Sequence, residues 1–246
     1  MRINKFLLFI YFSTVLNATG LPKEYYKIKD TKQKTTAFFN YLYPLVVESN
    51  NNILKQREFV KNYLTNLKKP VDTSTPEYKK LLELAQKYKI KEKDLYNLSK
   101  YLKKIDTVSP SMVLAQAAVE SNWGKSRFTK EANNIFGQWT YKGKGLIPKR
   151  RRSGHKHKIK LYNSLEESIQ GYMELLNKGT AYKKFRTIRQ SFSKQNLAPN
   201  GLVLSQTMVN YSGIGRKYLK ILRSVIRKYN LQKFDKLYYG ENKNKK

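Results

Sequence analysis

The segment SPSMVLAQAAVESNWG, residues 109–124, constrains the fold of this chain more strongly than any other part of the sequence. Ser109 can cap the start of a helix, Pro110 fits the first helical position, and Gly124 lies where a helix must end. Almost every residue between them is apolar or small, so the helix is expected to lie in a core against close neighbours. The segment therefore predicts a central helix in a mainly α domain.

One carboxylate interrupts this apolar helix, at its last turn. Glu120 follows Gln116 by four residues, so the two side chains share a helix face. The negative end of the helix dipole and the neighbouring Val119 and Trp123 disfavour a charged carboxylate there. We expect a raised pKa and a proton donor near neutral pH. A surface glutamate that happens to fall at a helix end is the alternative.

The residues before this helix predict a helical N-terminal region, 21–105. Apolar residues recur at helical spacing in AFFNYLYPLVVESNNN, with interruptions expected at Pro44 and at Asn50–Asn52. A further helix is expected to start at Pro76, and another to cover about 92–105. These amphipathic helices are expected to pack on their neighbours rather than to carry chemistry.

Residues 1–20, MRINKFLLFIYFSTVLNATG, have the three zones of a secretory signal: a basic start, an apolar run and a small, polar end. The apolar run is too short for a comfortable membrane span. We expect an exported protein of the periplasm or cell envelope, with no integral membrane domain beyond this signal, which is either cleaved or kept as an anchor. The chain has no cysteine, and its two histidines lie among lysines and arginines, so no disulfide, metal or other cofactor is expected.

The formal net charge of +33 favours polyanionic partners. The secretory signal and the lack of any helix-turn-helix, RNP or zinc-finger pattern argue against nucleic acid, so an anionic polymer of the cell envelope is expected. KRRR at 149–152, with Lys156, Lys158 and Lys160, is expected to form a basic flap beside the site. Solvated helix faces are the alternative explanation of the charge.

Four motifs occur together in this chain: AVESNWGKSRF, NNIFGQW, YNSLEESIQGYM and YSGIGRKYLKIL. With them the chain resembles glycoside hydrolase family 73, in particular the Bax-type bacterial glucosaminidases, over about residues 30–235. The resemblance implies a lysozyme-like α domain at 106–235 with a small basic β-hairpin or loop lobe. The composition of the last residues predicts a basic tail at 236–246. It also implies a peptidoglycan hydrolase that acts as an N-acetylglucosaminidase, with Glu120 as the general acid.

The resemblance also supplies candidates for the rest of the site. Tyr211 matches a tyrosine that lines the site in relatives and is expected to act with Glu120, and Tyr218 competes with it for this role. The glycine turn before Tyr218 differs in spacing from the usual one and lacks its acidic residue. The residues expected to contact the substrate are Gln116, Trp123, Gln138, Trp139 and Tyr218.

A second carboxylate is missing where it is expected. Glycosidases usually place one about 5–5.5 Å from the acid as a nucleophile, or about 6.5–9.5 Å away as a base. From Ala132 to Leu165 the chain has no Asp or Glu. Glu131, Glu166 and Glu167 are the nearest candidates, but Ser164 and Glu167 form a capping box, which predicts a structural role for Glu167.

A single acid is sufficient in two reactions of this substrate class. In a substrate-assisted glucosaminidase the 2-acetamido oxygen of the sugar attacks the anomeric carbon. In a lytic transglycosylase the 6-hydroxyl of the muramyl sugar attacks instead. The resemblance favours the first reaction, and a lytic transglycosylase or muramidase is the alternative enzyme. A non-catalytic, cationic envelope-binding protein would explain the charge equally well, but would not need a carboxyl at a buried helix end.

Overall fold

The computed structural model describes residues 19–148, 154 and 156–243. Within them, eleven α-helices and one small antiparallel sheet confirm the predicted mainly α, lysozyme-like fold. Most of the predicted signal and the whole KRRR run lie outside the described residues.

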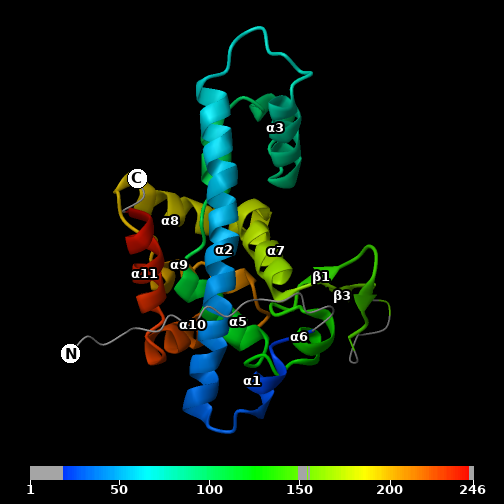
Figure 1. Ribbon diagram of the computed structural model, residues 1–246, viewed down its shortest axis with the longest axis vertical. Helices are drawn as coiled ribbons and strands as arrows, with labels where there is room; N and C mark the ends of the chain where they lie inside the picture. Colours follow the sequence, from blue (N-terminus) through cyan, green and yellow to red (C-terminus); the bar gives the residue numbers. More distant parts are fainter. Residues whose placement is uncertain (1–18, 149–153, 155, 244–246) are drawn as a thin grey trace, which may run out of the picture.

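The elements follow one another along the chain as in Figure 1. In order they are α1 (Lys23–Lys27), α2 (Thr31–Thr65), α3 (Pro76–Lys87), η1 (Glu92–Asp94), α4 (Leu98–Lys104), α5 (Pro110–Glu120), α6 (Arg127–Ala132), β1 (Trp139–Thr140), β2 (Gly145–Leu146), β3 (Lys158–Lys160), α7 (Leu165–Lys178), η2 (Thr180–Tyr182), α8 (Lys183–Lys194), α9 (Gly201–Ser205), η3 (Met208–Asn210), α10 (Arg216–Lys228) and α11 (Gln232–Lys243).

Helix α2 runs without a break for 35 residues and extends along most of the molecule (Figure 1). The interruptions predicted at Pro44 and at Asn50–Asn52 are therefore wrong. Proline removes one backbone donor from a helix. However, Leu42, two residues before Pro44, and Val46, two residues after it, are buried and hold α2 against the core. Burial along the helix outweighs the local preference for a break.

Asn50 is a docking residue rather than a helix breaker. Its side chain accepts a hydrogen bond from the backbone N–H of Val108 and donates one to the carbonyl of the same residue, both at 2.9 Å. Val108 comes two residues before α5 begins. The long N-terminal helix thus fixes the entry into the central helix, and Asn50 is fully buried in doing so.

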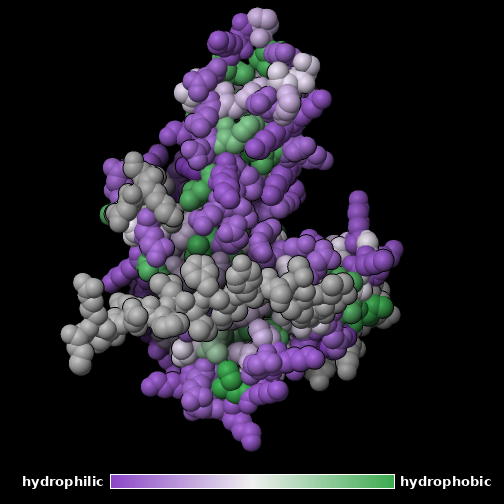
Figure 2. All heavy atoms as spheres, in the orientation of Figure 1, coloured by the Kyte–Doolittle hydropathy of each residue, from purple (hydrophilic) through white to green (hydrophobic). Residues whose placement is uncertain are grey.

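The upper part of the molecule is formed by the second half of α2 and by α3, which packs beside it (Figure 1). The predicted start of α3 is confirmed, with Thr75 Oγ1 accepting from the N–H of Tyr78 at 3.2 Å and Pro76 at the first position. The helix predicted over 92–105 is present as two pieces, η1 and α4. Hydrophilic side chains cover most of the face shown in Figure 2, as the net charge of +33 leads one to expect.

Helix α5 lies at the centre and contacts α2, α9, α10 and α11. Ser109 occupies the N-cap position, but its side chain does not cap the helix, contrary to the prediction. The cap is Asp235 of α11, whose Oδ1 accepts from the N–H of Ser111 and from Ser109 Oγ, both at 2.7 Å. A carboxylate distant in sequence performs the task that the local pattern assigned to a serine.

The predicted small basic lobe is a three-stranded antiparallel sheet in the order β1–β3–β2. Ile159 of β3 is its buried centre and pairs with Trp139 on one side and Leu146 on the other. The lobe projects to one side of the helical body (Figure 1). Its outer surface carries exposed Trp139, Tyr141 and Ile147 among lysines.

The C-terminal helix α11 continues through Lys243, so residues 236–243 are part of the folded body and not of a separate tail. Tyr238 is only 1% exposed there. None of the helices in the described residues is both long enough and apolar enough to cross a membrane.

Candidate active site

Glu120 lies in the last turn of α5, as the sequence predicts, and is the final residue of the helix. Directly after it, Ser121 Oγ donates to the carbonyl of Ala117 at 2.6 Å and accepts from the N–H of Gly124 at 2.7 Å. Asn122, Trp123 and Gly124 have φ angles of 49°, 56° and 70°. Left-handed backbone at three successive residues ends the helix abruptly, and this leaves the Glu120 carboxyl on a rigid support.

The turn after Glu120 is held by the N-terminal segment. The hydroxyl of Tyr25 donates to the carbonyl of Trp123 at 2.8 Å, and that of Tyr26 donates to the carbonyl of Gly124 at 3.1 Å. A Cβ atom added at Gly124 would lie 2.1 Å from Leu21 Cδ1. Glycine is required here by both its conformation and its surroundings.

Burial raises the pKa of the half-buried Glu120 carboxyl, in the predicted direction. A hydrogen bond with the Tyr218 hydroxyl acts in the opposite direction and lowers the pKa, but less strongly. Burial disfavours the charged form, whereas a donated hydrogen bond stabilises it. The position can hold a carboxylic acid with a proton to give.

Gln116 lies behind Glu120, one helical turn away, and is fully buried. Its Nε2 donates to the hydroxyl of Tyr218 at 2.9 Å, and its Oε1 accepts from the hydroxyl of Tyr172. Tyr218 is itself only 1% exposed. The contacts of Gln116 and Tyr218 therefore suit the support of Glu120; the sugar-binding role assigned to them from the sequence stays a prediction.

Tyr211 joins the same group of tyrosines. Its ring stacks parallel to that of Tyr218, with centroids 6.0 Å apart, and its hydroxyl donates to the carbonyl of Phe136 at 3.1 Å. Burial raises the Tyr211 pKa, and the charge of Glu120 adds to the shift. The two tyrosines that compete for the site in the sequence thus lie side by side near Glu120, and the catalytic role of Tyr211 stays a prediction.

The two tryptophans have different surroundings. Trp123 packs edge-on against Phe38, Phe39 and Tyr229, with ring centroids 5.0–5.5 Å apart. This aromatic cluster joins the turn after Glu120 to α2 and to the end of α10. The contacts are those of a packing residue, and binding of sugar by Trp123 stays a prediction.

Trp139 lies on β1 and is 58% exposed. One face of its indole ring stacks on His157, at 4.2 Å between ring centroids. The neighbouring Gln138 accepts through Oε1 from the hydroxyl of Tyr162 at 2.8 Å. Trp139 is thus available at the surface of the lobe, and sugar contact by either residue stays a prediction.

The candidates for a second carboxylate all have structural partners. Glu131 is half-exposed and forms an ion pair with Arg127 at 3.1 Å. Glu166 accepts a hydrogen bond from Gln170 Nε2 at 2.8 Å. Among the described residues, no carboxylate contributes to the pKa shift of Glu120.

Glu167 has the capping role that the sequence predicts. Ser164 Oγ accepts from the N–H of Glu167 at 3.1 Å. In return, the Glu167 carboxylate accepts from the N–H of Asn163 at 2.9 Å, one residue before the expected position. The carboxylate is thus engaged at the start of α7.

Lysines of the lobe provide positive charge on β3 and before it. Lys156 is exposed, Lys158 Nζ donates to the carbonyl of Gly143 at 3.3 Å, and the ammonium of Lys160 lies 4.6 Å from the ring centre of Tyr162. The other part of the predicted basic flap, 149–152, is outside the described residues.

Sequence reasoning missed Tyr172, which connects α7 to Gln116. Its spacing with Leu165, Ile169 and Leu176 marks a buried helix stripe. A single hydroxyl in such an aliphatic stripe needs a buried partner, and this was the available signal.

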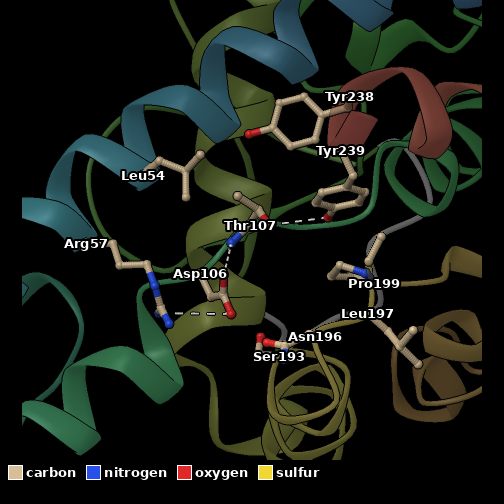
Figure 3. Close-up of a pocket in the computed structure, with 11 residues that line it drawn as sticks. Leu54, Arg57, Asp106, Thr107, Ser193, Asn196, Leu197, Pro199, Tyr238 and Tyr239 are labelled. Carbon is tan, nitrogen blue, oxygen red and sulfur yellow. Dashed lines mark hydrogen bonds and ion pairs between the residues drawn. The ribbon is translucent and has the colours of Figure 1, made fainter. Parts of the chain in front are cut away.

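A separate pocket of about 410 Å³ lies near the other end of α5 (Figure 3). Arg57 and Asp106 form an ion pair at 4.0 Å in its wall, and Thr107 shares a hydrogen bond with Tyr239 at 3.3 Å.

In the described part of the chain, no group of three or more His, Cys, Asp or Glu residues could hold a metal ion.

Two curated proteins are similar to this chain. Protein bax of Escherichia coli (strain K12) is 28% identical over 187 residues, which cover 74% of this chain and 65% of that protein. The exo-glucosaminidase LytG of Bacillus subtilis (strain 168) is 28% identical over 141 residues, which cover 53% of this chain and 47% of that protein. The chain therefore spans less than two thirds of the length of these relatives. No solved structure matches it.

A family model named Glucosaminidase and described as mannosyl-glycoprotein endo-beta-N-acetylglucosaminidase matches residues 96–231. This range is more than half of the 246 residues, and it includes Glu120, the tyrosines around it and the three-stranded lobe. The chain belongs to this glucosaminidase family.

Proposed function

We propose that this protein is a glycoside hydrolase that cleaves the glycan backbone of peptidoglycan as an N-acetylglucosaminidase, with Glu120 as its general acid. The observation that carries the proposal is a half-buried carboxyl with a raised pKa at the rigid end of the central helix, within the region that the family model matches. The printed name of the Bacillus subtilis relative, an exo-glucosaminidase, supports the same activity.

In the proposed reaction the protonated Glu120 gives its proton to the glycosidic oxygen of the leaving sugar. The 2-acetamido oxygen of the N-acetylglucosamine unit attacks the anomeric carbon, and water then opens the cyclic intermediate. The engaged states of Glu131, Glu166 and Glu167 support this single-acid route, because none of them contributes to the Glu120 pKa shift.

The proposed substrate and location agree with the charge of the chain. Peptidoglycan strands carry acidic peptides, and a net charge of +33 favours contact with them and with other anionic polymers of the envelope. The signal-like sequence of residues 1–20 supports export to the periplasm or cell envelope. No metal or nucleotide takes part in the proposed reaction.

Mass spectrometry of the soluble fragments from digested sacculi tests the activity. A glucosaminidase releases fragments with a reducing N-acetylglucosamine end. Fragments that end in anhydromuramic acid would instead indicate a lytic transglycosylase, and no fragments at all would indicate a binding protein.

Replacement of the other three acids tests the single-acid route. Glu131→Gln, Glu166→Gln and Glu167→Gln are each expected to retain most of the activity. Glu167→Gln should lower the unfolding free energy by about 1 kcal/mol through its cap. A folded variant among them that is as inactive as Glu120→Gln would reveal a second catalytic carboxylate.

A further inference from the structure

A chain of hydrogen bonds connects three helices to the Glu120 carboxyl. Tyr172 of α7 donates to Gln116 Oε1, and Gln116 Nε2 donates to the Tyr218 hydroxyl of α10 at 2.9 Å. The Tyr218 hydroxyl in turn lies close enough to Glu120 to lower the pKa of that carboxyl by hydrogen bonding. Neither Tyr172 nor Gln116 has any exposed surface.

The Tyr172 hydroxyl determines which group donates and which accepts at each of these hydrogen bonds. Its hydroxyl is buried, and among the described residues Gln116 Oε1 is the acceptor that it reaches. A buried hydroxyl donor without an acceptor is costly. The Gln116 amide must therefore present its oxygen to Tyr172 and its NH₂ group to Tyr218. The Tyr218 oxygen receives that N–H, and its own proton is directed to Glu120.

The surrounding rings hold both tyrosines in place. Tyr172 stacks on Phe136 with ring centroids 4.0 Å apart and an angle of 10° between the planes. Tyr218 is stacked by Tyr211 at an angle of 8°. The packed rings hold the two hydroxyl oxygens in place, and the partners that these oxygens reach determine the order of donors and acceptors.

We propose that Tyr172 and Gln116 are positioning residues that keep the Tyr218 proton on one oxygen of the Glu120 carboxyl, so that the acid proton resides on the other oxygen. This inference rests on the proposed role of Glu120 as general acid. The same hydrogen bond receives the carboxylate that forms when the acid proton leaves. The amide of Gln116 thus determines which Glu120 oxygen acts on the substrate.

The groups around Glu120 make this arrangement visible in a pH profile. Burial raises the pKa of four tyrosines around Glu120, and the charge of Glu120 adds to each shift. They come from α7, η2, the end of η3 and α10: Tyr172, Tyr182, Tyr211 and Tyr218. Helix α2 contributes phenylalanine rings near the same turn. No charged side chain of the described residues contributes to the Glu120 shift. We therefore expect the alkaline limb of the kcat/KM profile to report loss of the Glu120 proton, at a pH above the ordinary glutamate pKa.

The test compares Tyr172→Phe, Gln116→Met and the double variant, using soluble peptidoglycan fragments as substrate. Tyr172→Phe frees the Gln116 amide to turn and to accept the Tyr218 proton, so kcat should fall about tenfold while KM changes less than about twofold. The alkaline limb should move up by about half a pH unit or more, because the carboxylate loses its donor. Gln116→Met should move the limb in the same direction. The double variant should match Gln116→Met alone, because Tyr172 acts through Gln116.

Tyr88→Phe is the matched control, since the buried Tyr88 hydroxyl also donates to a glutamine, Gln56, at 2.9 Å but outside the site. It should leave kcat, KM and the alkaline limb unchanged. The positioning role would be overturned if the alkaline limb of Tyr172→Phe lay at the same pH as in the wild type. It would also be overturned if the losses of kcat in the two single variants added up in the double variant. If Glu120→Gln is inactive in the same assay, that result leaves the proposed function intact; an active Glu120→Gln would remove the proposed function itself.

Discussion

The two ends of α5 each carry one carboxylate, and their surroundings differ. At the N-terminal end, the buried Asp235 of α11 accepts four hydrogen bonds of 2.6–3.2 Å from residues of the first turn and from α9. At the C-terminal end, the half-buried Glu120 bonds to Tyr218. One carboxylate is saturated by donors, and the other retains an oxygen that is free for chemistry in the proposed mechanism.

The helix dipole explains why the two groups suit their positions. The N-terminal end of a helix stabilises a negative charge, and the C-terminal end disfavours it. Burial raises the pKa of both carboxyls, but at Asp235 four hydrogen bonds oppose the shift, against one at Glu120. The helix thus binds one carboxylate as a structural cap and leaves the other with a raised pKa, as its proposed role of general acid requires.

Replacement of Glu120 is expected to give the largest effect on activity. Glu120→Gln removes the proton donor while it keeps the size and the hydrogen-bonding capacity of the side chain, so the release of fragments from sacculi should fall at least about a hundredfold. Circular dichroism should show an unchanged helix content. A folded Glu120→Gln protein with most of its activity would contradict the assignment of Glu120 as the general acid.

Replacement of Asp235 should instead act on stability. Asp235→Ala leaves the Ser111 N–H and the Gly201 N–H without their acceptor in a buried place, which should lower the unfolding free energy by about 3 kcal/mol. Urea unfolding measures the loss. At urea concentrations where the variant remains folded, its kcat should stay within a few-fold of the wild-type value. A loss of activity as large as that of Glu120→Gln would mean that Asp235 also takes part in the chemistry.

The turn at the reactive end can be tested with two glycines that share a positive φ. Gly124→Ala combines a strained φ of 70° with a Cβ that would lie 2.1 Å from Leu21 Cδ1, and should cost about 2 kcal/mol of unfolding free energy. Gly143→Ala has a similar φ of 72° but no atom within 4 Å of the added Cβ, and should cost about 1 kcal/mol. Equal losses would show that the packing of Leu21 does not support the turn.

The position of Glu120 in the fold was predictable, because its signals are local. Pro110 begins α5 and Glu120 lies in its last turn, both as predicted, although the helix ends at Glu120, four residues before Gly124. The pKa direction also follows from a carboxyl at the end of an apolar helix. Thr75 before α3 and Ser164 before α7 cap their helices as predicted for the same reason.

The cap end could not be predicted from local patterns. Asp235 is 124 residues from Ser111, whose N–H it accepts, and Asn50 is 58 residues from Val108. Both are polar residues that a local pattern assigns to the surface or to a helix break. Tertiary hydrogen bonds override these preferences, which is why α2 continues through its asparagines and why Ser109 is not the cap.

The smallest expected effect concerns the dependence of stability on pH. The folded pKa of Glu120 is raised above its unfolded value, so the contribution of this carboxyl to stability is present below the unfolded pKa and is lost as pH rises through the folded pKa. Glu120→Gln does not titrate there. Its urea midpoint, relative to the wild type, should therefore rise between about pH 4 and about pH 8.

Asp235→Asn is the comparison at the N-terminal end of α5. The pKa shift of Asp235 has the same direction, but an amide cannot replace the second acceptor oxygen, so this variant should be less stable than the wild type at both pH values. A difference in urea midpoint between Glu120→Gln and the wild type that stays constant between about pH 4 and about pH 8 would show that the fold does not favour the protonated form of Glu120.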